Sequence, residues 1–147
     1  MKKILLFLIT TIFNVNAFSQ KSPDILIDQF ATNLAEVSAD TAVTQLFSTN
    51  QWMSRNLDAT DQVSRQLSNT LPLIGNFIGK ELITKKQVGT SLVLYSYLFK
   101  YERQPIRFNF VFYKPTDEWV IYKFNYDDKL DDELIEAGTL YFLDLNQ

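Results

Sequence analysis

The stretch IRFNFVFYKPTDEWVIYKFNY, residues 106–126, decides the fold class of this 147-residue chain. Aromatic and polar residues alternate along it with a period of two, which is typical of strands that bury one face. Pro115, Thr116 and Asp117 interrupt the alternation with turn-forming residues. The stretch is therefore predicted to form a β-hairpin whose strands span residues 106–114 and 119–126.

The same period of two extends upstream over residues 81–88 and 92–101, which predicts two further strands. Residues 102–105 are polar and contain a proline, so they are expected to close a second antiparallel hairpin. In the expected registers Tyr101 lies opposite Ile106, and Lys114 lies opposite Glu118. Both registers agree on which third-strand residues share a face, whereas a slip of one residue would invert a strand.

The two faces of this predicted sheet differ in composition. One face carries Tyr95, Tyr97, Phe99, Tyr101, Ile106, Phe108, Phe110, Phe112, Val120, Tyr122, Phe124 and Tyr126. The other carries Leu92, Leu94, Ser96, Leu98, Lys100, Arg107, Asn109, Val111, Tyr113, Trp119, Ile121, Lys123 and Asn125. We expect the first face to be the core, because the second mixes apolar and charged residues as a partly solvated surface does.

The chain before the sheet has helical periodicity. Ser22, Pro23 and Asp24 are typical of a helix start, and apolar residues then recur at helical spacing up to Val37. Further helices are predicted from Ser38 to about residue 52 and from residue 58 to the region of residue 72, and a last one after the acidic segment 127–133. The chain is thus predicted to be an α+β protein with helices before the sheet.

Residues 1–19 have the pattern of a secretory signal peptide. Lys2 and Lys3 precede an apolar run over residues 4–13, and Ala17 and Ser19 supply the small residues before a cleavage point. A membrane anchor would need roughly 20 apolar residues. We therefore expect cleavage after Ser19, a single domain over residues 20–147, no membrane anchor after cleavage, and a periplasmic or secreted location.

Composition excludes several kinds of chemistry. The chain has no Cys and no His, so thiol nucleophiles, catalytic triads, disulfides and ordinary zinc or copper sites are ruled out. The acidic segment 127–133 lacks the glycine and the closing glutamate of a calcium-binding loop, and neither a metal nor a cofactor is predicted. A net charge of −3 without a basic stripe argues against a nucleic-acid partner.

The order of these elements resembles a known superfamily. Helices come first, Gly79-Lys80-Glu81 leads into the sheet, and Asp117-Glu118-Trp119-Val120 leads into its last strand. In this the chain is similar to the NTF2-like (cystatin-like) α+β superfamily over nearly all of residues 20–147, and particularly to small exported bacterial members without an assigned function. The resemblance implies a cone in which the helices pack in the concave face of a curved sheet. The acidic segment and the helix after it depart from that pattern.

The aromatic face has two interpretations. Rings that face inward are ordinarily a filled core. However, several of them are tyrosines, whose hydroxyl groups need partners when buried, and large rings can leave a cavity with a few polar groups. In that case a flat or apolar small ligand is expected at Tyr95, Tyr97, Phe110, Tyr122 and Tyr126.

The other face of the sheet is the predicted interaction surface. Its apolar candidates are Leu94, Leu98, Val111, Tyr113, Trp119 and Ile121, which basic residues surround. Such a patch suits a homodimer or an envelope protein partner. The alternative is that the C-terminal helix of the same chain covers it.

An enzymatic role is the alternative to binding. The superfamily that this chain resembles includes isomerases and cyclases, which use an Asp base inside the cone, often with Tyr or His. The predicted inner face contains no carboxylate, and only Asp61 or Glu81 could supply one if the geometry turned it inward. The prediction is therefore a non-catalytic domain, and a cofactor-independent isomerase or cyclase with a buried carboxylate and a Tyr is the alternative.

Overall fold

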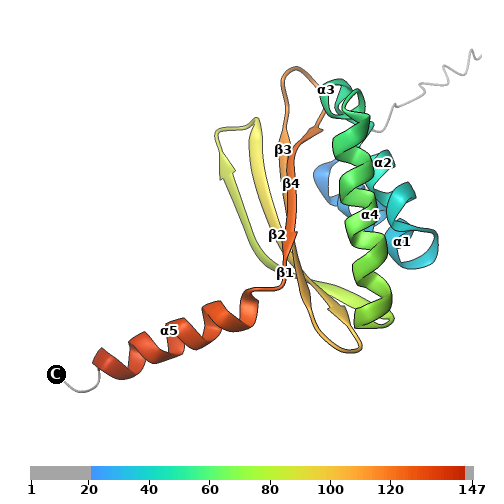
Figure 1. Ribbon diagram of the computed structural model, residues 1–147. Coiled ribbons are helices and arrows are strands. Elements are labelled where there is room, and N and C mark those ends of the chain that lie inside the picture. The colour runs from blue at the N-terminus through green and yellow to red at the C-terminus, as the bar shows by residue number, and fades with distance from the viewer. Residues whose placement is uncertain (1–20, 145–147) are drawn as a thin grey trace, which may run out of the picture.

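The computed structural model of the protein describes the backbone of residues 21–144 and the side chains of residues 21–139. Within this range helices precede a four-stranded antiparallel sheet, and one more helix follows it (Figure 1). The predicted α+β class and the predicted order of elements are confirmed. The expected signal peptide, residues 1–19, lies outside the described residues.

The helices before the sheet are α1 (Pro23–Glu36), α2 (Ala39–Phe47), α3 (Gln51–Ser54) and α4 (Leu57–Ile74). Each begins after a Ser or Asn whose side-chain oxygen accepts a hydrogen bond from a backbone N–H in the first turn. Helix α4 continues through Pro72 and ends at Gly75, where φ is +89°. Helices α1, α2 and α4 lie on the concave face of the curved sheet (Figure 1).

The strands are β1 (Phe77–Val88), β2 (Leu92–Tyr101), β3 (Ile106–Tyr113) and β4 (Val120–Asp127), and they lie in this order across the sheet. The predicted bounds of β2, β3 and β4 are correct to within one residue. Strand β1 begins earlier than predicted, because its first residues pair with the end of β2.

The predicted register of β2 with β3 is wrong by two residues. Phe99, not Tyr101, lies opposite Ile106, and Tyr101 instead pairs with Phe77 on β1. The connection between β2 and β3 is held by the end of α4, since the Glu102 N–H bonds to the Asn76 carbonyl oxygen at 3.2 Å. A shift of two residues preserves the faces, so the predicted inner residues of β2 and β3 do point inward.

The register of β4 contains a β-bulge that the sequence analysis did not anticipate. Val111 pairs with Lys123 whereas the adjacent Phe112 pairs with Ile121, so Tyr122 is the extra residue. Because of the bulge, the side chains in the first half of β4 point to the faces opposite to those predicted. Ile121 is fully buried and Tyr122 is 61% exposed.

Residues 119–122 therefore exchange faces relative to the prediction. Trp119 and Ile121, expected on the outer face, pack against or within the core. Val120 and Tyr122, expected on the inner face, lie outside, and the Tyr122 ring meets the Tyr113 ring at 6.2 Å between centroids.

The centre of the aromatic face is a filled core. Phe99, Phe108, Phe110 and Phe112 are completely buried. Phe30 of α1 packs against the rings of Phe99, Phe108, Phe110 and Phe124, with centroids 5.3–6.3 Å apart. The core interpretation is therefore correct for the middle of the sheet.

Helix α5 (Leu130–Asp144) projects away from the domain on the side of the sheet opposite α1, α2 and α4 (Figure 1). Its side chains from Asp131 to Thr139 are exposed, including Leu134 and Ile135. In the described residues, α5 therefore does not cover the outer face of the sheet, contrary to the alternative considered from the sequence.

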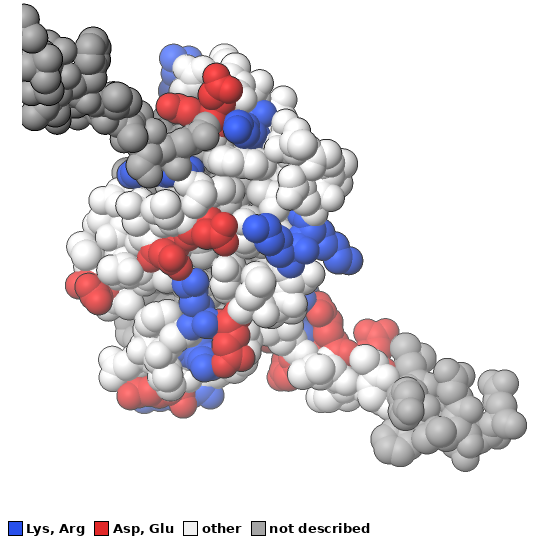
Figure 2. Space-filling view, turned by 180° about the vertical axis from the view of Figure 1, so that it is seen from behind, with Lys and Arg blue, Asp and Glu red and all other residues white. Residues whose placement is uncertain are grey.

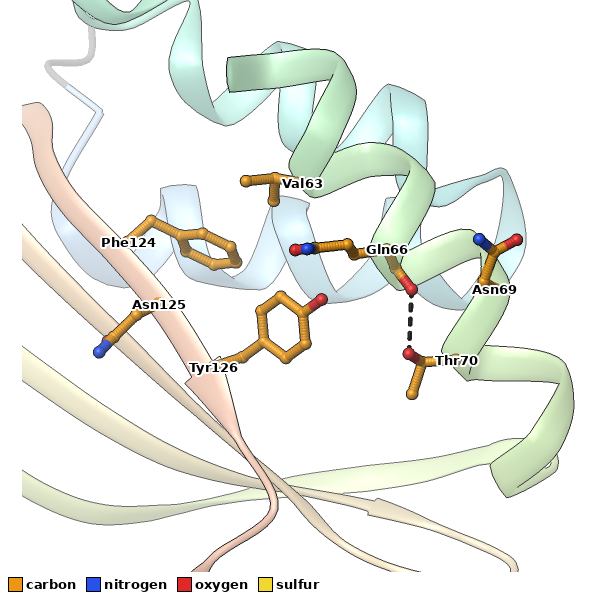
Figure 3. A pocket seen from close by; sticks show the side chains of 7 residues that line it. All are labelled: Val63, Gln66, Asn69, Thr70, Phe124, Asn125 and Tyr126. Atoms are coloured by element: carbon orange, nitrogen blue, oxygen red, sulfur yellow. Dashed lines mark hydrogen bonds between the residues drawn. The ribbon is translucent and has the colours of Figure 1, made fainter. Parts of the chain in front are cut away.

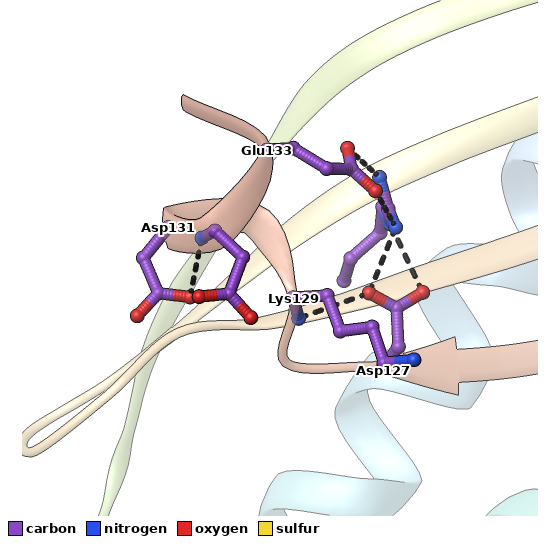
Figure 4. A network of polar contacts seen from close by, with 6 residues as sticks. Asp127, Lys129, Asp131 and Glu133 are labelled. Atoms are coloured by element: carbon purple, nitrogen blue, oxygen red, sulfur yellow. Dashed lines mark hydrogen bonds and ion pairs between the residues drawn. The ribbon is translucent and has the colours of Figure 1, made fainter. Parts of the chain in front are cut away.

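The start of α5 is fixed to the sheet by one arginine. The Arg107 guanidinium on β3 donates two hydrogen bonds to Asp127, at 2.8 and 3.1 Å, and two to Glu133 of α5, at 2.7 and 2.8 Å. Figure 4 shows the Asp127 and Glu133 carboxylates converging on this guanidinium. The hydrogen bonds from Arg107 lower the pKa of Glu133.

We expect the substitution Arg107→Gln to release α5 from the sheet. Loss of the two bonds to Asp127 should lower the free energy of unfolding by about 1–3 kcal/mol. Amide hydrogen exchange of residues 130–139 should become faster than in the wild type. Because the pKa of Glu133 is lowered, its contact stabilises above the ordinary Glu pKa and is lost in acid, so acid should loosen α5 only in the wild type.

The control is Lys123→Gln, which removes the same charge from an exposed position on the outer face. It should leave exchange in α5 unchanged. Equal exchange of α5 in both variants would contradict the role of Arg107.

Candidate functional site

The structure does not bring the predicted ligand-binding residues together. Tyr95 and Tyr97 lie near β1, Phe110 is buried in the centre of the core, and Tyr122 is on the outer face. Tyr126 lines a hollow between α4 and β4, whereas Tyr122 lines a different one, next to α3. The five residues thus do not form one cavity.

The hollow next to Tyr126 has a volume of about 640 Å³, and we call it the α4–β4 groove. Its lining residues are Val63, Gln66, Asn69, Thr70, Phe124, Asn125 and Tyr126. Figure 3 shows Val63, Gln66 and Thr70 of α4 facing Phe124 and Tyr126 of β4. The two groups face one another because α4 places residues three and four apart on one side of the helix.

The chemistry of the α4–β4 groove is polar but uncharged. None of its lining residues is acidic or basic, and burial raises the pKa of the Tyr126 hydroxyl, so this group stays protonated at neutral pH. Gln66 and Asn69 offer amide donors and acceptors opposite the two rings. This lining can bind an uncharged ligand, and it supplies no group that would exchange a proton near pH 7.

Tyr95 and Tyr97 belong to a polar seam between α1 and β1. Their rings are stacked 6.3 Å apart, and the Tyr95 hydroxyl donates to Asp24 at 2.9 Å. The ammonium groups of Lys85 and Lys80 lie over the two rings, at 4.6 and 4.4 Å from the centroids. Burial raises the pKa of both hydroxyls. These tyrosines therefore join α1 to the sheet.

Neither carboxylate considered for the enzymatic alternative points into the core. Asp61 is exposed on α4 near Arg65, and Glu81 is exposed on β1, where it bonds to Lys100. In the part of the chain that the structure describes, the buried polar residues are Thr60, Ser64 and Ser96. The interior formed by the described residues therefore contains no carboxylate that could act as the base of an isomerase or a cyclase.

A second hollow, of about 410 Å³, lies where α4 meets β1. The Tyr101 side chain lines it, and the Tyr101 hydroxyl is buried without a hydrogen-bond partner among the described residues. Burial raises the pKa of this hydroxyl. The hollow is smaller than the α4–β4 groove.

The outer face remains uncovered in the described structure. Leu94, Leu98 and Val111 are half-buried there, and Tyr113 is 42% exposed. Tyr113 and Tyr122 also line an apolar hollow of about 710 Å³ that extends to Trp52 of α3. The side of the molecule drawn in Figure 2 carries acidic and basic side chains interspersed, without a basic stripe.

None of the helices in residues 21–144 is long and apolar enough to span a bilayer. Over the same range the acidic side chains form no cluster of three or more that could hold a metal ion.

The comparisons add no relative. No known protein family, no curated protein and no solved structure matches the chain. The described residues form an α+β arrangement with a four-stranded antiparallel sheet, which is compatible with an NTF2-like fold.

Proposed function

We propose that the protein is an exported, non-catalytic binding domain of the NTF2-like type, and that the α4–β4 groove is its binding site. The observation that carries this proposal is the composition of the groove, where two aromatic rings face neutral amide and hydroxyl groups. Its volume of about 640 Å³ lies within the usual range of ligand sites. Export is supported by the apolar run after Lys2 and Lys3.

The expected ligand is uncharged and has a flat or apolar part. That part would lie against Phe124 and Tyr126, since aromatic faces favour stacking and apolar contact. Its polar edge would bond to Gln66 or Thr70. A charged ligand is disfavoured, because the groove offers no opposite charge to offset the cost of removing it from water.

The test begins with the full-length chain expressed in a heterologous host and recovered from the exported fraction. Its mass reports whether cleavage occurs after Ser19, and a native mass spectrum reports a bound small molecule. The variant Gln66→Glu places a charge in the groove, whereas Gln62→Glu places the same charge one turn away on α4, outside the lining.

We expect a bound molecule on the wild type and on Gln62→Glu, and at least tenfold less of it on Gln66→Glu. A molecule that binds all three equally would contradict the assignment of the groove. So would the absence of any ligand-induced change in the resonances of Phe124 and Tyr126 across a library of uncharged compounds.

A homodimer through the outer face is the second candidate function. The observation that favours it is that α5 leaves this face uncovered, with the Tyr113 and Tyr122 rings exposed beside Leu94 and Val111. Light scattering of the exported chain should then give twice the monomer mass, and Tyr122→Glu should return the monomer. A wild-type monomer at high micromolar concentration would leave an envelope protein as the remaining partner for this face.

A further inference from the structure

We propose that the ligand of the α4–β4 groove is an extended, uncharged peptide segment that pairs with β4 as a fifth strand. This inference rests on the proposed function, because it requires the groove to be the binding site. The proposal depends on the backbone N–H and C=O groups of β4 in addition to the side chains that line the groove.

The hydrogen-bonding pattern of β3 shows which groups of β4 point outward. The Lys114 N–H bonds to the Ser91 carbonyl at 2.8 Å, on the β2 side. Because backbone groups alternate along a strand, the other even-numbered residues of β3 also face β2, and its odd-numbered residues face β4. The partners of these odd-numbered residues on β4 are Lys123, Asn125 and Asp127. The N–H and C=O groups of Phe124 and Tyr126 therefore point to the free edge of the sheet.

The first half of β4 gives an independent check. The Ile121 N–H donates to the Thr49 hydroxyl at 3.0 Å, and its carbonyl accepts from the Asn50 side chain at 2.7 Å. The outward groups of Ile121 are thus satisfied by the connection between α2 and α3. No described residue does the same for Phe124 or Tyr126, and both of these residues line the groove.

The opposite edge of the sheet is protected against strand pairing. Strand β1 has two irregularities in its register, between Phe77 and Gly79 and between Leu82 and Thr84. It also carries Lys80, Lys85 and Lys86. Bulges and lysines are the usual means by which an edge strand avoids pairing with another chain. Strand β4 has its bulge at Tyr122 and its lysine at position 123, both before Phe124, so the segment from Phe124 to Tyr126 has neither.

The surroundings of that segment define its occupant. An unpaired row of N–H and C=O groups is complementary to an extended backbone. Helix α4 faces the Phe124 and Tyr126 side chains, so the inward side chains of a strand added to β4 would extend the aromatic wall opposite α4. Alternate side chains of the peptide would lie against Phe124 and Tyr126, and the neutral lining favours uncharged ones.

The experiment screens a phage-displayed library of twelve-residue peptides against the exported chain. A binding peptide is then resynthesised with each backbone nitrogen methylated in turn. We expect methylation at every second position in the bound segment to weaken binding at least tenfold, with little effect in between. In the free protein the Phe124 and Tyr126 amides should exchange faster than those of Lys123 and Asn125, and the peptide should protect them.

A pair of variants tests the same point on the protein. Tyr126→Pro removes an outward N–H and leaves the bonds to β3 intact, whereas Tyr126→Val removes the ring alone. We expect the proline variant to bind the peptide at least tenfold more weakly than the valine variant. The methylation scan does not depend on either variant being well folded.

The outcomes separate the two proposals. Small molecules that shift the groove resonances, with no peptide binder or with a flat methylation scan, would overturn the peptide and leave the binding site standing. If neither peptides nor small molecules affect Phe124 and Tyr126, both proposals fail.

Discussion

The substitution Phe30→Ala should lower the free energy of unfolding by about 3–5 kcal/mol. Phe30 is 1% exposed, and it is the ring through which α1 meets the aromatic face of the sheet. Its removal would leave a cavity bounded by rings of three strands that cannot move inward together. Since small domains are stable by about 5–15 kcal/mol, this one change should bring the chain close to unfolding.

The measurement is equilibrium unfolding in urea, with Ile25→Ala as the control. Ile25 lies on the same helix but is 41% exposed, so its loss should cost less than about 1 kcal/mol. The chain has no cysteine, and so no disulfide masks the difference. Similar midpoints for the two variants would show that the ring cluster does not hold α1 to the sheet.

The substitution Gly75→Ala should cost about 2–4 kcal/mol, through backbone strain together with a steric clash. Gly75 ends α4 with φ +89° and ψ −164°, a conformation that glycine alone adopts readily. An added Cβ would lie 2.6 Å from a carboxylate oxygen of Glu102 and 2.9 Å from its Cβ. That carboxylate accepts the Asn76 N–H at 3.0 Å, so it cannot move away without losing this bond.

Gly79→Ala is the matched control, because a Cβ there would meet only the end of the Lys100 side chain at 3.9 Å. A second measurement follows Glu102 itself, whose pKa is lowered chiefly by the hydrogen bond from the Asn76 N–H. In Gly75→Ala the Glu102 pKa should rise toward its ordinary value, which an NMR titration would show. Since a lowered carboxyl pKa stabilises above the ordinary value, part of the difference between wild type and variant should vanish in acid. Equal loss of stability at both glycines would contradict the clash with Glu102.

The period of two predicted the strands and the faces of β2 and β3, but it could not fix their registers. A register shifted by two residues satisfies the same alternation, so Tyr101 opposite Ile106 and Phe99 opposite Ile106 are equally consistent with the sequence. The choice is made by the end of α4, which binds Glu102 and Arg103 and draws Tyr101 toward β1. Such a tertiary contact leaves no periodic signal.

The bulge at Tyr122 is the reason that the predicted site and the predicted interface each lost members. Residues 119–122 are all apolar or aromatic, so either face is acceptable to them by hydrophobicity. What decides is the pairing of the Ile121 backbone with Thr49 and Asn50, which lie more than 70 positions earlier in the chain.

The α4 wall of the groove was not predicted at all. Gln66, Asn69 and Thr70 are polar residues beside the stripe of α4 that buries Leu67, and polar residues next to such a stripe ordinarily indicate a solvated surface. They become a wall only because β4 is the edge strand beside them. The direction of α5 was equally hidden, since it depends on how Arg107 binds Asp127 and Glu133.

The hydrogen bonds that join Ile121 to Thr49 and Asn50 also fix one end of the α4–β4 groove. They tie β4 to the helical layer at its beginning, and no comparable tie among the described residues exists at Phe124 or Tyr126. The other end of the groove is tied as well, because the Arg103 N–H in the β2–β3 connection bonds to the Ile74 carbonyl at the end of α4, at 3.0 Å. The groove therefore runs along β4 between two points at which helices and sheet are joined. A bound molecule would enter from the side, between the two joined ends, and would lie along β4 rather than across it.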